Sequence, residues 1–416
     1  MSAPPRRFAQ GAFSLVSVCA RVLGPLAVLL ILARSFAPEA FGRFSLYLAI
    51  AGLLGLVGDY GLGASALPDL VESGRRIRAA FRQMAGFRLV IGTATMAVGS
   101  AAVLGLSAID EPRLFIVCAG IALVSGFVDF SLLPLRAVQA YSREAAAALI
   151  SAAAYVAGVA VAVSWTRDLV AVAVVCLLFR VLALGAVLAI WRGVARELGL
   201  AARPGGTARE AFGARLRRGG PYLLDSLLSA AINYVDTLLI GGLLGAAAVG
   251  LYQPPAKILQ ASLLIVQVAA SVYLPPLVRA SARAEQKRLI DRMSVELSVI
   301  GLVAALAVGA LAPPLLDRLF GSAYRLPALA WIGFACALWG RLAAAGYGIA
   351  LIANRRPADR VAGQLLVLLT FATGVLATAP RFALTGVAWS FAAAMGVALS
   401  FYFARVRRLY PRRPSQ

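Results

Sequence analysis

The sequence contains no histidine and only four cysteines among its 416 residues. The absence of histidine excludes histidine-dependent acid–base chemistry and histidine metal sites. Cys19, Cys118, Cys176 and Cys336 lie inside apolar runs without CxxC spacing, so we interpret them as small hydrophobic residues rather than disulfides or metal ligands. No Walker A motif is present, which argues against ATP hydrolysis. We therefore predict no catalytic residue, no metal site and no cofactor.

Charged residues are scarce as well. They make up 14% of the chain, against about a quarter in soluble proteins, while 61% of residues are hydrophobic and the mean hydropathy is +0.85. These values exclude a water-soluble enzyme and a disordered chain. A membrane helix needs about 20 apolar residues, so with loops a chain of this length has room for about twelve.

Apolar runs indicate twelve membrane-spanning helices. Their expected ranges are 11–36, 44–66, 83–107, 114–136, 144–164, 169–191, 219–243, 248–272, 292–316, 326–352, 361–379 and 384–404.

Basic residues are distributed unequally between the two sides of these helices. With the N-terminus inside, 28 of the 40 lysines and arginines fall in inner segments, seven in outer segments and five in spans. The positive-inside rule then predicts that both termini are cytoplasmic. The net charge of +22 is an orientation signal on this interpretation, so we expect no nucleic-acid partner.

The two halves of the chain resemble each other. Segments 33–50 and 241–258 both cover the end of one helix, a short turn and the start of the next. Like residues stand 208 positions apart at Gly42 and Gly250, Phe44 and Tyr252, Pro68 and Pro276, and Arg75 and Arg283. Six helices in each half imply a parallel repeat about an axis along the membrane normal.

We therefore predict an all-α polytopic membrane protein with two pseudo-symmetric six-helix bundles around a central cleft. Its expected parts are an N-terminal bundle (1–200), a basic cytoplasmic linker (201–218), and a C-terminal bundle with a basic cytoplasmic tail (219–416).

Polar residues form stripes on the first two helices of each half. Polar side chains in a membrane turn towards protein or a hydrated cavity, so these four helices are expected to line a shared cleft. The candidate cavity-lining residues are Ser14, Ser17, Ser229, Asn233, Gln253, Gln260 and Gln267. Alternatively, serine and glutamine side chains only join neighbouring helices.

Four cations lie deep within spans, where a charge must be paired or hydrated. Arg21 and Lys257 are roughly 13–15 Å from a membrane face, at 1.5 Å per residue, and are the main candidates to bind an anion. Arg180 and Arg341 are further candidates, although each could form a structural pair. Arg88 is close enough to the inner face to extend into water, so we assign it a structural role.

Four deep carboxylates, Asp59, Asp129, Asp225 and Asp236, are candidates for ion coupling or charge balance. A buried aspartate can bind a proton near neutral pH and carry it across, or balance a nearby cation. Asp236 and Lys257 lie at similar depth on adjacent helices, so an ion pair between them is an equally good interpretation.

Three stretches carry a resemblance to a known family: ARSFAPEAFGRFSLYLAIAGLLGLVGDYGLGAS, YVDTLLIGGLLGAAAVGLYQPPAKI and LPPLVRASARAEQKRLIDRM, with LLDRLFGSAYR as a weaker fourth. In these the chain resembles the Wzx-type polysaccharide-biosynthesis (O-antigen and exopolysaccharide) flippases of the multidrug/oligosaccharidyl-lipid/polysaccharide (MOP) superfamily. The resemblance implies alternating-access transport of an undecaprenyl-pyrophosphate-linked oligosaccharide across the bacterial inner membrane. Arg21 and Lys257 would then meet the pyrophosphate or acidic sugars.

The same resemblance implies membrane lipids as partners, together with a polysaccharide polymerase and a chain-length regulator. Two alternatives belong to the same superfamily. A multidrug or cation antiporter needs acidic groups in its cavity, whereas cations predominate here. The lipid II flippase branch usually carries two further helices after the twelfth. An acyltransferase or polymerase would be expected to have histidine or arginine motifs in large outer loops.

Overall fold

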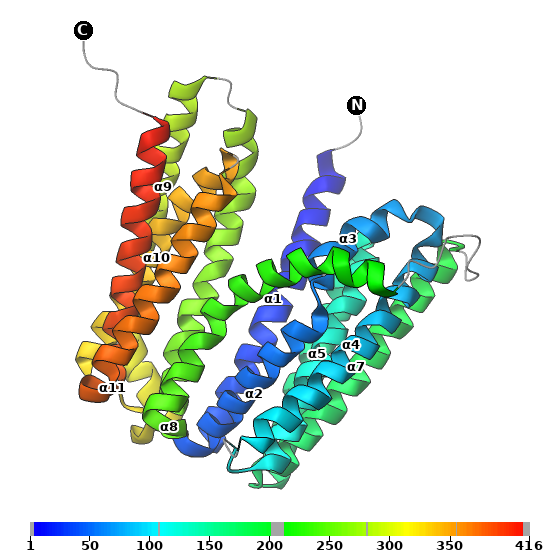
Figure 1. Ribbon diagram of the computed structural model, residues 1–416, viewed down its shortest axis with the longest axis horizontal. Helices are drawn as coiled ribbons and strands as arrows, with labels where there is room; N and C mark the ends of the chain where they lie inside the picture. The colour runs from blue at the N-terminus through cyan, green and yellow to red at the C-terminus, as the bar shows by residue number, and fades with distance from the viewer. Residues whose placement is uncertain (1–3, 107–108, 201–211, 280–281, 355, 411–416) are drawn as a thin grey trace. The chain divides into compact units, whose positions relative to one another are not determined.

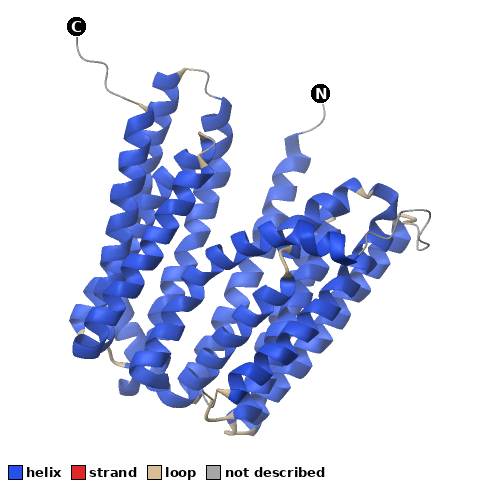
Figure 2. Ribbon diagram, in the orientation of Figure 1, coloured by secondary structure: helices blue, strands red, loops and turns tan. Residues whose placement is uncertain are grey.

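The computed structural model describes residues 4–106, 109–200, 212–279, 282–354 and 356–410. In these ranges the chain forms helices and loops without any strand (Figure 2). The helices of the first half are α1 (Pro4–Ser35), α2 (Pro38–Asp59), α3 (Leu62–Glu72), η1 (Gly74–Arg76), α4 (Ile77–Gly105), α5 (Pro112–Ala137), α6 (Tyr141–Trp165) and α7 (Leu169–Glu197). Those of the second half are α8 (Phe212–Arg279), α9 (Arg283–Phe320), η2 (Ser322–Tyr324), α10 (Ala328–Ala353) and α11 (Pro357–Leu409) (Figure 1).

Ten helices in the described ranges are long and apolar enough to cross a membrane. Two of them, α8 and α11, each contain two helices joined at a kink, at Gly245 and Ala383. Counting the two arms of each separately gives twelve helices, as predicted from the apolar runs. The all-α polytopic fold with two six-helix bundles is thereby confirmed.

The two kinks have different backbone origins. Gly245 has φ 82°, which glycine adopts without steric cost. Ala383 has φ 46° and ψ −133°, a conformation that is unfavourable for a residue with a Cβ. Both reverse the chain between two membrane-length helices without an intervening loop.

Several predicted helix boundaries are wrong: the helix expected over 292–316 runs from Arg283 to Phe320, and the one expected over 44–66 already begins at Pro38. The helix expected over 44–66 ends at Asp59, because Tyr60 and Gly61 have positive φ values of 48° and 75°. The short helix α3 then begins, and the Asp59 carboxylate accepts a hydrogen bond from the Gly63 backbone N–H at 2.7 Å. An aspartate therefore stabilises the first turn of α3 where a continuous membrane helix had been expected.

The chain divides into two compact units. Unit 1 comprises residues 1–36 and 44–234, and unit 2 comprises residues 37–43 and 235–416. In unit 1, α1 packs on α6, and α7 packs on α5 and α6; in unit 2, α10 packs on α9 and α11. Of the expected linker 201–218, residues 201–211 lie outside the described residues, and α8 is already helical from Phe212.

The start of α2 belongs to unit 2, where it crosses the second arm of α8 at two glycines. A Cβ added at Gly42 would lie 1.8 Å from the carbonyl oxygen of Ala246, and one at Gly250 would lie 1.9 Å from that of Pro38. The two contacted residues, Pro38 and Ala246, are 208 positions apart, as are Gly42 and Gly250. The contact is therefore reciprocal, as at a two-fold interface, and it explains why this segment is alike in both halves.

The helix bounds extend the repeat beyond the residues that revealed it. α1 and α8 begin 208 positions apart, at residues 4 and 212. Later helices are offset by 216 positions: α5 and α10 begin at 112 and 328, and α6 and α11 begin at 141 and 357. The additional residues lie in α9, which has 38 residues where its counterpart α4 has 29.

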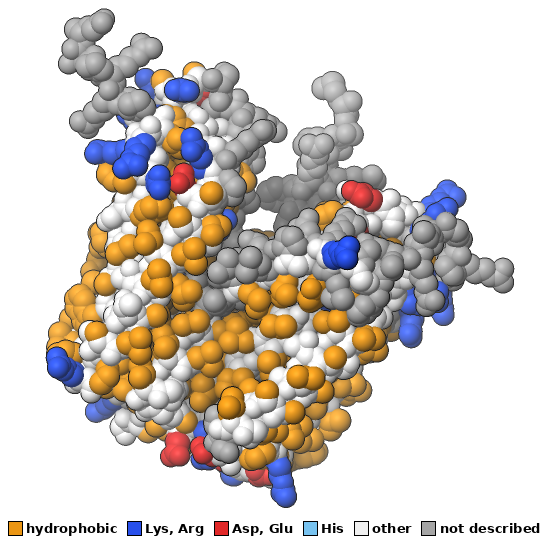
Figure 3. Space-filling model, viewed as in Figure 1, with side chains coloured by type: hydrophobic (Ala, Val, Ile, Leu, Met, Phe, Trp, Pro, Cys, Tyr) orange, Lys and Arg blue, Asp and Glu red, His pale blue; other side chains and the backbone are white. Residues whose placement is uncertain are grey.

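The visible outer surface carries many hydrophobic side chains along the helices (Figure 3). Examples of exposed large residues are Val98, Leu182, Leu306 and Leu369. Such continuous apolar exposure fits a surface in contact with lipid. Aromatic rings fill the interior instead; in unit 1, Phe81 stacks on Phe130 with ring centroids 5.4 Å apart.

Candidate functional site

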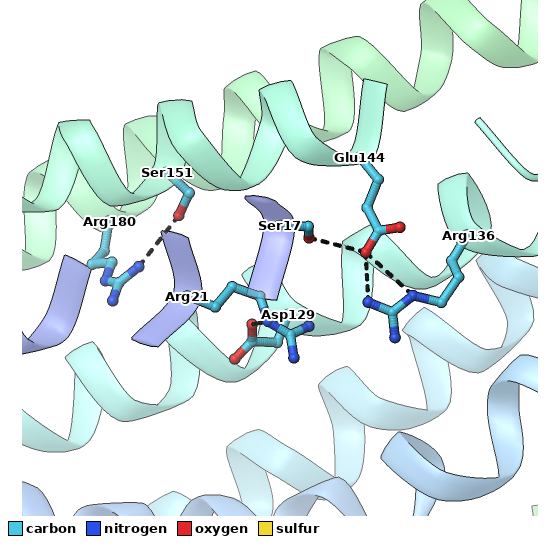
Figure 4. Close-up of polar contacts among 7 residues, drawn as sticks. All are labelled: Ser17, Arg21, Asp129, Arg136, Glu144, Ser151 and Arg180. Atoms are coloured by element: carbon cyan, nitrogen blue, oxygen red, sulfur yellow. Dashed lines mark hydrogen bonds and ion pairs between the residues drawn. The ribbon is translucent and has the colours of Figure 1, made fainter. Parts of the chain in front are cut away.

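Arg21 and Asp129 form an accessible ion pair in unit 1 (Figure 4). Arg21 comes from α1 and Asp129 from α5, and the Nε–Oδ1 distance is 3.9 Å. The two side chains are 36% and 62% exposed. A pair at this distance and exposure is weak and keeps room around both charges. The structure thus brings together two residues that the sequence had identified separately.

A second polar cluster in unit 1 surrounds a fully buried carboxylate. Glu144 of α6 is fully buried, accepts a hydrogen bond from Ser17 at 3.1 Å and pairs with Arg136, whose Nε lies 3.2 Å from Oε1. Figure 4 shows Ser17 and Arg136 converging on this carboxylate from α1 and α5. Ser17, a predicted cavity residue, therefore joins helices in this structure. Ser14, one turn away, is half-buried.

Arg180 is also held by neighbouring helices. Its Nη1 donates to the Ser151 hydroxyl at 3.3 Å, and its guanidinium carbon lies 3.8 Å from the centroid of the Tyr155 ring. The side chain is buried. A cation–π contact of this kind accommodates the charge within the bundle, so these contacts provide a structural role for Arg180.

The expectation that Arg88 extends into water is wrong. Arg88 is buried and forms an ion pair with Asp59, with side-chain exposures of 10% and 14%. Its guanidinium also lies over the rings of Phe127 and Phe130, at 5.5 and 5.0 Å from their centroids. Counting depth along α4 cannot reveal a carboxylate on another helix. The Arg88 charge is therefore compensated by its ion pair with Asp59 and not by water, as had been expected. Asp59 thus balances Arg88 and caps α3.

In unit 2, two side-chain hydrogen bonds bridge the arms of α8 across its kink. The Tyr252 hydroxyl donates to Asp236 Oδ2 at 2.7 Å, and Gln253 Nε2 donates to Thr237 Oγ1 at 3.2 Å. Asp236 Oδ1 also accepts the Thr237 backbone N–H at 2.6 Å. All four residues are buried. Asp236 therefore has hydrogen-bond donors on both carboxylate oxygens.

Lys257 lies near Asp236 but contacts a different residue. Its Nζ donates to Gln260 Oε1 at 2.8 Å, and the described contacts include no direct ion pair with Asp236. Electrostatic interaction with Asp236 reaches both Lys257 and Arg341. Arg341 donates to the Leu259 carbonyl oxygen at 3.4 Å. Two cations thus surround one hydrogen-bonded carboxylate, in place of the simple pair considered from the sequence.

The remaining candidate residues lie on α8, and only some of their side chains are described. Gln260 is half-buried and Gln267 is exposed. Asp225, Ser229 and Asn233 lie on the first arm of α8, and their side chains are outside the described part of the structure.

Sequence reasoning missed several members of these clusters, among them Arg136, Glu144 and Tyr252. Arg136 was counted only as an orientation signal, and Glu144 was not considered, because its partner Ser17 is 127 positions away. Tyr252 was noted only as the counterpart of Phe44. The repeat did contain a usable signal there: Asp236 aligns with Val28, so a hydroxyl and a carboxylate appear together in the second half only.

Comparison with known proteins identifies a matching family and solved structures with the same fold. The model of the family described as polysaccharide biosynthesis protein matches residues 8–281, whereas no curated protein matches by sequence. The lipid II flippase MurJ in an inward closed conformation has a TM-score of 0.70 at 13% identity, over 95% of this chain and 87% of that one.

Transporters of the multidrug resistance MATE family have the same fold. One in an inward-facing conformation, of the MOP superfamily, has a TM-score of 0.69 at 15% identity, over 95% of this chain and 98% of that one. The Vibrio cholerae MATE transporter VcmN in its bent form has a TM-score of 0.57 at 15% identity, over 97% and 98% of the two chains. At such identities the likeness establishes the fold alone.

The family model covers most of the chain, and the fold agrees with it. The described helices make this a multi-pass membrane protein, and the solved structures that share its fold are a flippase and transporters. Because the family model matches residues 8–281, about two thirds of the chain, the chain belongs to the polysaccharide biosynthesis protein family.

Proposed function

We propose that the protein moves a lipid-linked oligosaccharide, carried on undecaprenyl pyrophosphate, across the bacterial inner membrane for O-antigen or exopolysaccharide synthesis. Both termini are cytoplasmic in this proposal, and its two halves line a cleft that opens alternately to each side. The sugar and pyrophosphate cannot enter hydrocarbon, whereas the polyprenyl chain can remain in it. Only the head group then needs a hydrated, cationic path.

The observation that supports this proposal best is the accessible Arg21–Asp129 pair. The carboxylates of the pairs Arg88–Asp59 and Arg136–Glu144 are 14% and 0% exposed, whereas Asp129 is 62% exposed beside Arg21, which is 36% exposed. A pyrophosphate offers several charged oxygens, and a guanidinium binds such groups through two parallel hydrogen bonds. It can therefore compete with a single carboxylate at 3.9 Å.

In unit 2, Lys257 is the corresponding candidate. Its described hydrogen bond goes to the neutral Gln260, so its positive charge is not cancelled by direct contact with a carboxylate. We propose that Lys257 binds a phosphate or acidic sugar with help from Gln260 and Gln267. Asp236 balances the local charge, and Arg341 and Arg180 act in supporting positions.

The wider proposal also concerns partners and parts of the chain. A polysaccharide polymerase and a chain-length regulator would use the repeat units that this protein delivers. Residues 1–200 and 219–416 would act as the two moving bundles, joined through the basic segment 201–218. Asp129 and Asp225 complete the candidates for charge balance or ion coupling.

A flipping assay in proteoliposomes tests the proposal directly. The protein is reconstituted with a fluorescent undecaprenyl-pyrophosphate oligosaccharide, and a membrane-impermeant reagent reports how much label reaches the other leaflet. We expect Arg21→Gln to slow transfer at least tenfold. Asp129→Asn is expected to strengthen head-group binding, because Arg21 loses its competing carboxylate.

Arg143→Gln is the matched control. Arg143, in the first turn of α6, pairs at 3.4 Å with Glu197 at the end of α7, and its side chain is 57% exposed. This pair lies outside the proposed cleft. Its transfer rate should stay within twofold of the parent. Full transfer by well-folded Arg21→Gln would refute the anion site. Absence of glycolipid transfer by the parent protein, with efflux of cationic drugs instead, would refute the flippase proposal.

A further inference from the structure

A second candidate site lies in unit 2, at the end where α11 finishes and α9 begins. A cavity of about 320 Å³ opens there among α9, α10 and α11. Figure 3 shows lysine and arginine side chains gathered near this end of the unit. The residues that line the cavity are Lys287, Ile290, Asp291, Tyr347, Phe403, Val406, Arg407 and Tyr410.

The cavity wall is held by side-chain hydrogen bonds between the three helices. The Tyr410 hydroxyl, just beyond α11, lies 2.6 Å from Gln286 Oε1 on α9 and 3.1 Å from Asn354 Oδ1 at the end of α10. Partial burial raises the pKa of Tyr410, so the hydroxyl stays protonated and donates. These contacts fix the end of α11 against its neighbours and keep the cavity walls in place.

The lining combines two cations with one carboxylate. Lys287 and Arg407 supply the positive charges, and the Arg407 guanidinium lies 4.4 Å from the centroid of the Phe403 ring, which orients it. Asp291 and Arg407 both interact electrostatically with Tyr347. Such a site suits a phosphodiester bound by the cations, with an adjacent ammonium or hydroxyl group that donates to Asp291.

The cavity lies near the ends of two membrane-length helices, where a lipid phosphate is expected. Arg407 is two residues from the end of α11, and Asp291 is eight residues from the start of α9, which is about 12 Å along the helix axis. The same face of α9 continues deeper with Val295, Val299 and Val303, all of them exposed. These follow Asp291 at steps of four and form an apolar row along which an acyl chain can lie.

We propose that this cavity binds the zwitterionic head group of a phospholipid, with the chemistry of phosphatidylethanolamine. Its phosphodiester contacts Lys287 and Arg407, its ammonium contacts Asp291, and one acyl chain follows the apolar row of α9. The site lies within unit 2 and does not involve Arg21 or Asp129. Its occupancy is therefore independent of which glycolipid the protein transports.

Native mass spectrometry of the purified full-length protein with added phosphatidylethanolamine tests this site. Lys287→Gln combined with Arg407→Gln should weaken lipid binding at least tenfold. The matched control is Arg288→Gln with Arg408→Gln, which removes the same charge from adjacent exposed positions outside the cavity lining. Binding by the control should stay within twofold of the parent. Equal loss in both double variants would show general surface attraction and overturn the proposal.

Two further arms identify the ligand. Phosphatidylmethanol has no ammonium group, so Asp291→Asn should reduce the preference for phosphatidylethanolamine over phosphatidylmethanol at least fivefold. An unchanged preference would overturn the role of Asp291. Soluble glycerophosphoethanolamine should not displace the lipid at equal concentration, because it has no acyl chain. Equal displacement would overturn the lipid assignment and leave a soluble phosphodiester as ligand. Unchanged melting temperatures exclude misfolding as the cause in each variant.

Discussion

The hydrogen bond between Tyr252 and Asp236 allows a quantitative test of how unit 2 accommodates a buried carboxylate. The first half of the chain has Phe44 and Val28 at the matching positions, and both are buried. The double variant Tyr252→Phe, Asp236→Val therefore converts the polar pair into the apolar pair that the first half already uses. Each single variant instead leaves one buried polar group without its partner.

The expected coupling follows from the contact. Double-mutant cycles on interhelical hydrogen bonds in membranes average about 0.6 kcal/mol and reach about 1.7 kcal/mol. A carboxylate acceptor, a 2.7 Å distance and full burial of the hydroxyl place this bond at the upper end, since bonds to charged groups are roughly twice as strong as neutral ones. We expect the double variant to be more stable than the sum of the singles by about 1.5 kcal/mol.

The assay is reversible unfolding in mixed micelles, followed by tryptophan fluorescence, for the parent, both singles and the double variant. Tyr402→Phe provides the control cycle with Asp236→Val, because the Tyr402 hydroxyl bonds instead to the Arg360 carbonyl oxygen at 3.1 Å. That cycle should be additive within about 0.5 kcal/mol. Additivity in the Tyr252 cycle as well would refute the reasoning that this bond stabilises Asp236 in the bundle.

Three further predictions concern backbone geometry and buried charge. Gly42→Ala should lower the free energy of unfolding by at least about 3 kcal/mol, because the new Cβ would overlap the Ala246 carbonyl. Gly105→Ala, whose Cβ would meet open space, should leave it unchanged. Equal free energies of unfolding for the two variants would contradict the tight crossing at Gly42. At the kinks, Gly245→Ala should destabilise the protein by about 1–2 kcal/mol. Ala383→Gly should instead raise the melting temperature by relieving about 1 kcal/mol of backbone strain. A lower melting temperature for Ala383→Gly would argue against strain at Ala383. Arg88→Gln should lower the free energy of unfolding by about 3–5 kcal/mol, because it leaves the Asp59 charge unpaired. Adding Asp59→Asn to the same chain should restore part of this stability in unfolding titrations. If it restores none, the lost ion pair does not explain the destabilisation.

The helices could be predicted from sequence because a bilayer imposes one strong condition on every spanning segment. Each must be apolar for about 20 residues and must satisfy its own backbone hydrogen bonds. The end of α2 at Asp59 escaped this reasoning because the residues after it remain apolar. Only the positive φ values of Tyr60 and Gly61 end the helix, and hydropathy does not report dihedral angles.

Side-chain pairing could be predicted only in part. Arg21 and Asp129 were both identified by their depth, yet nothing in one sequence indicates that residues 108 positions apart form a pair. The same limit hid the contact of Glu144 with Ser17 and led to the wrong environment for Arg88. A pattern along one helix shows that a charge needs compensation, but the partner depends on which helices pack together.

The repeat shows how the polar pairs that stabilise the fold differ between the two halves. Where one half has a sealed polar pair, both members change in the other half. Asp236 and Tyr252 correspond to Val28 and Phe44, and Asp59 and Arg88 correspond to Gln267 and Glu296. Because an unpaired buried charge is costly, the members of such a pair can only change together.

Arg21 and Lys257 differ from these buried charges in what they contact. Their counterparts are Ser229 and Ala49, so each cation appears in one half alone. Neither has a sealed carboxylate partner among the described contacts: Arg21 has the exposed Asp129, and Lys257 has the neutral Gln260. A cation that is kept within the membrane without such a partner requires another source of compensation, from water or from an anionic ligand. On this ground Arg21 and Lys257 are better candidates for head-group binding than Arg88, whose ion pair with Asp59 already accounts for its charge.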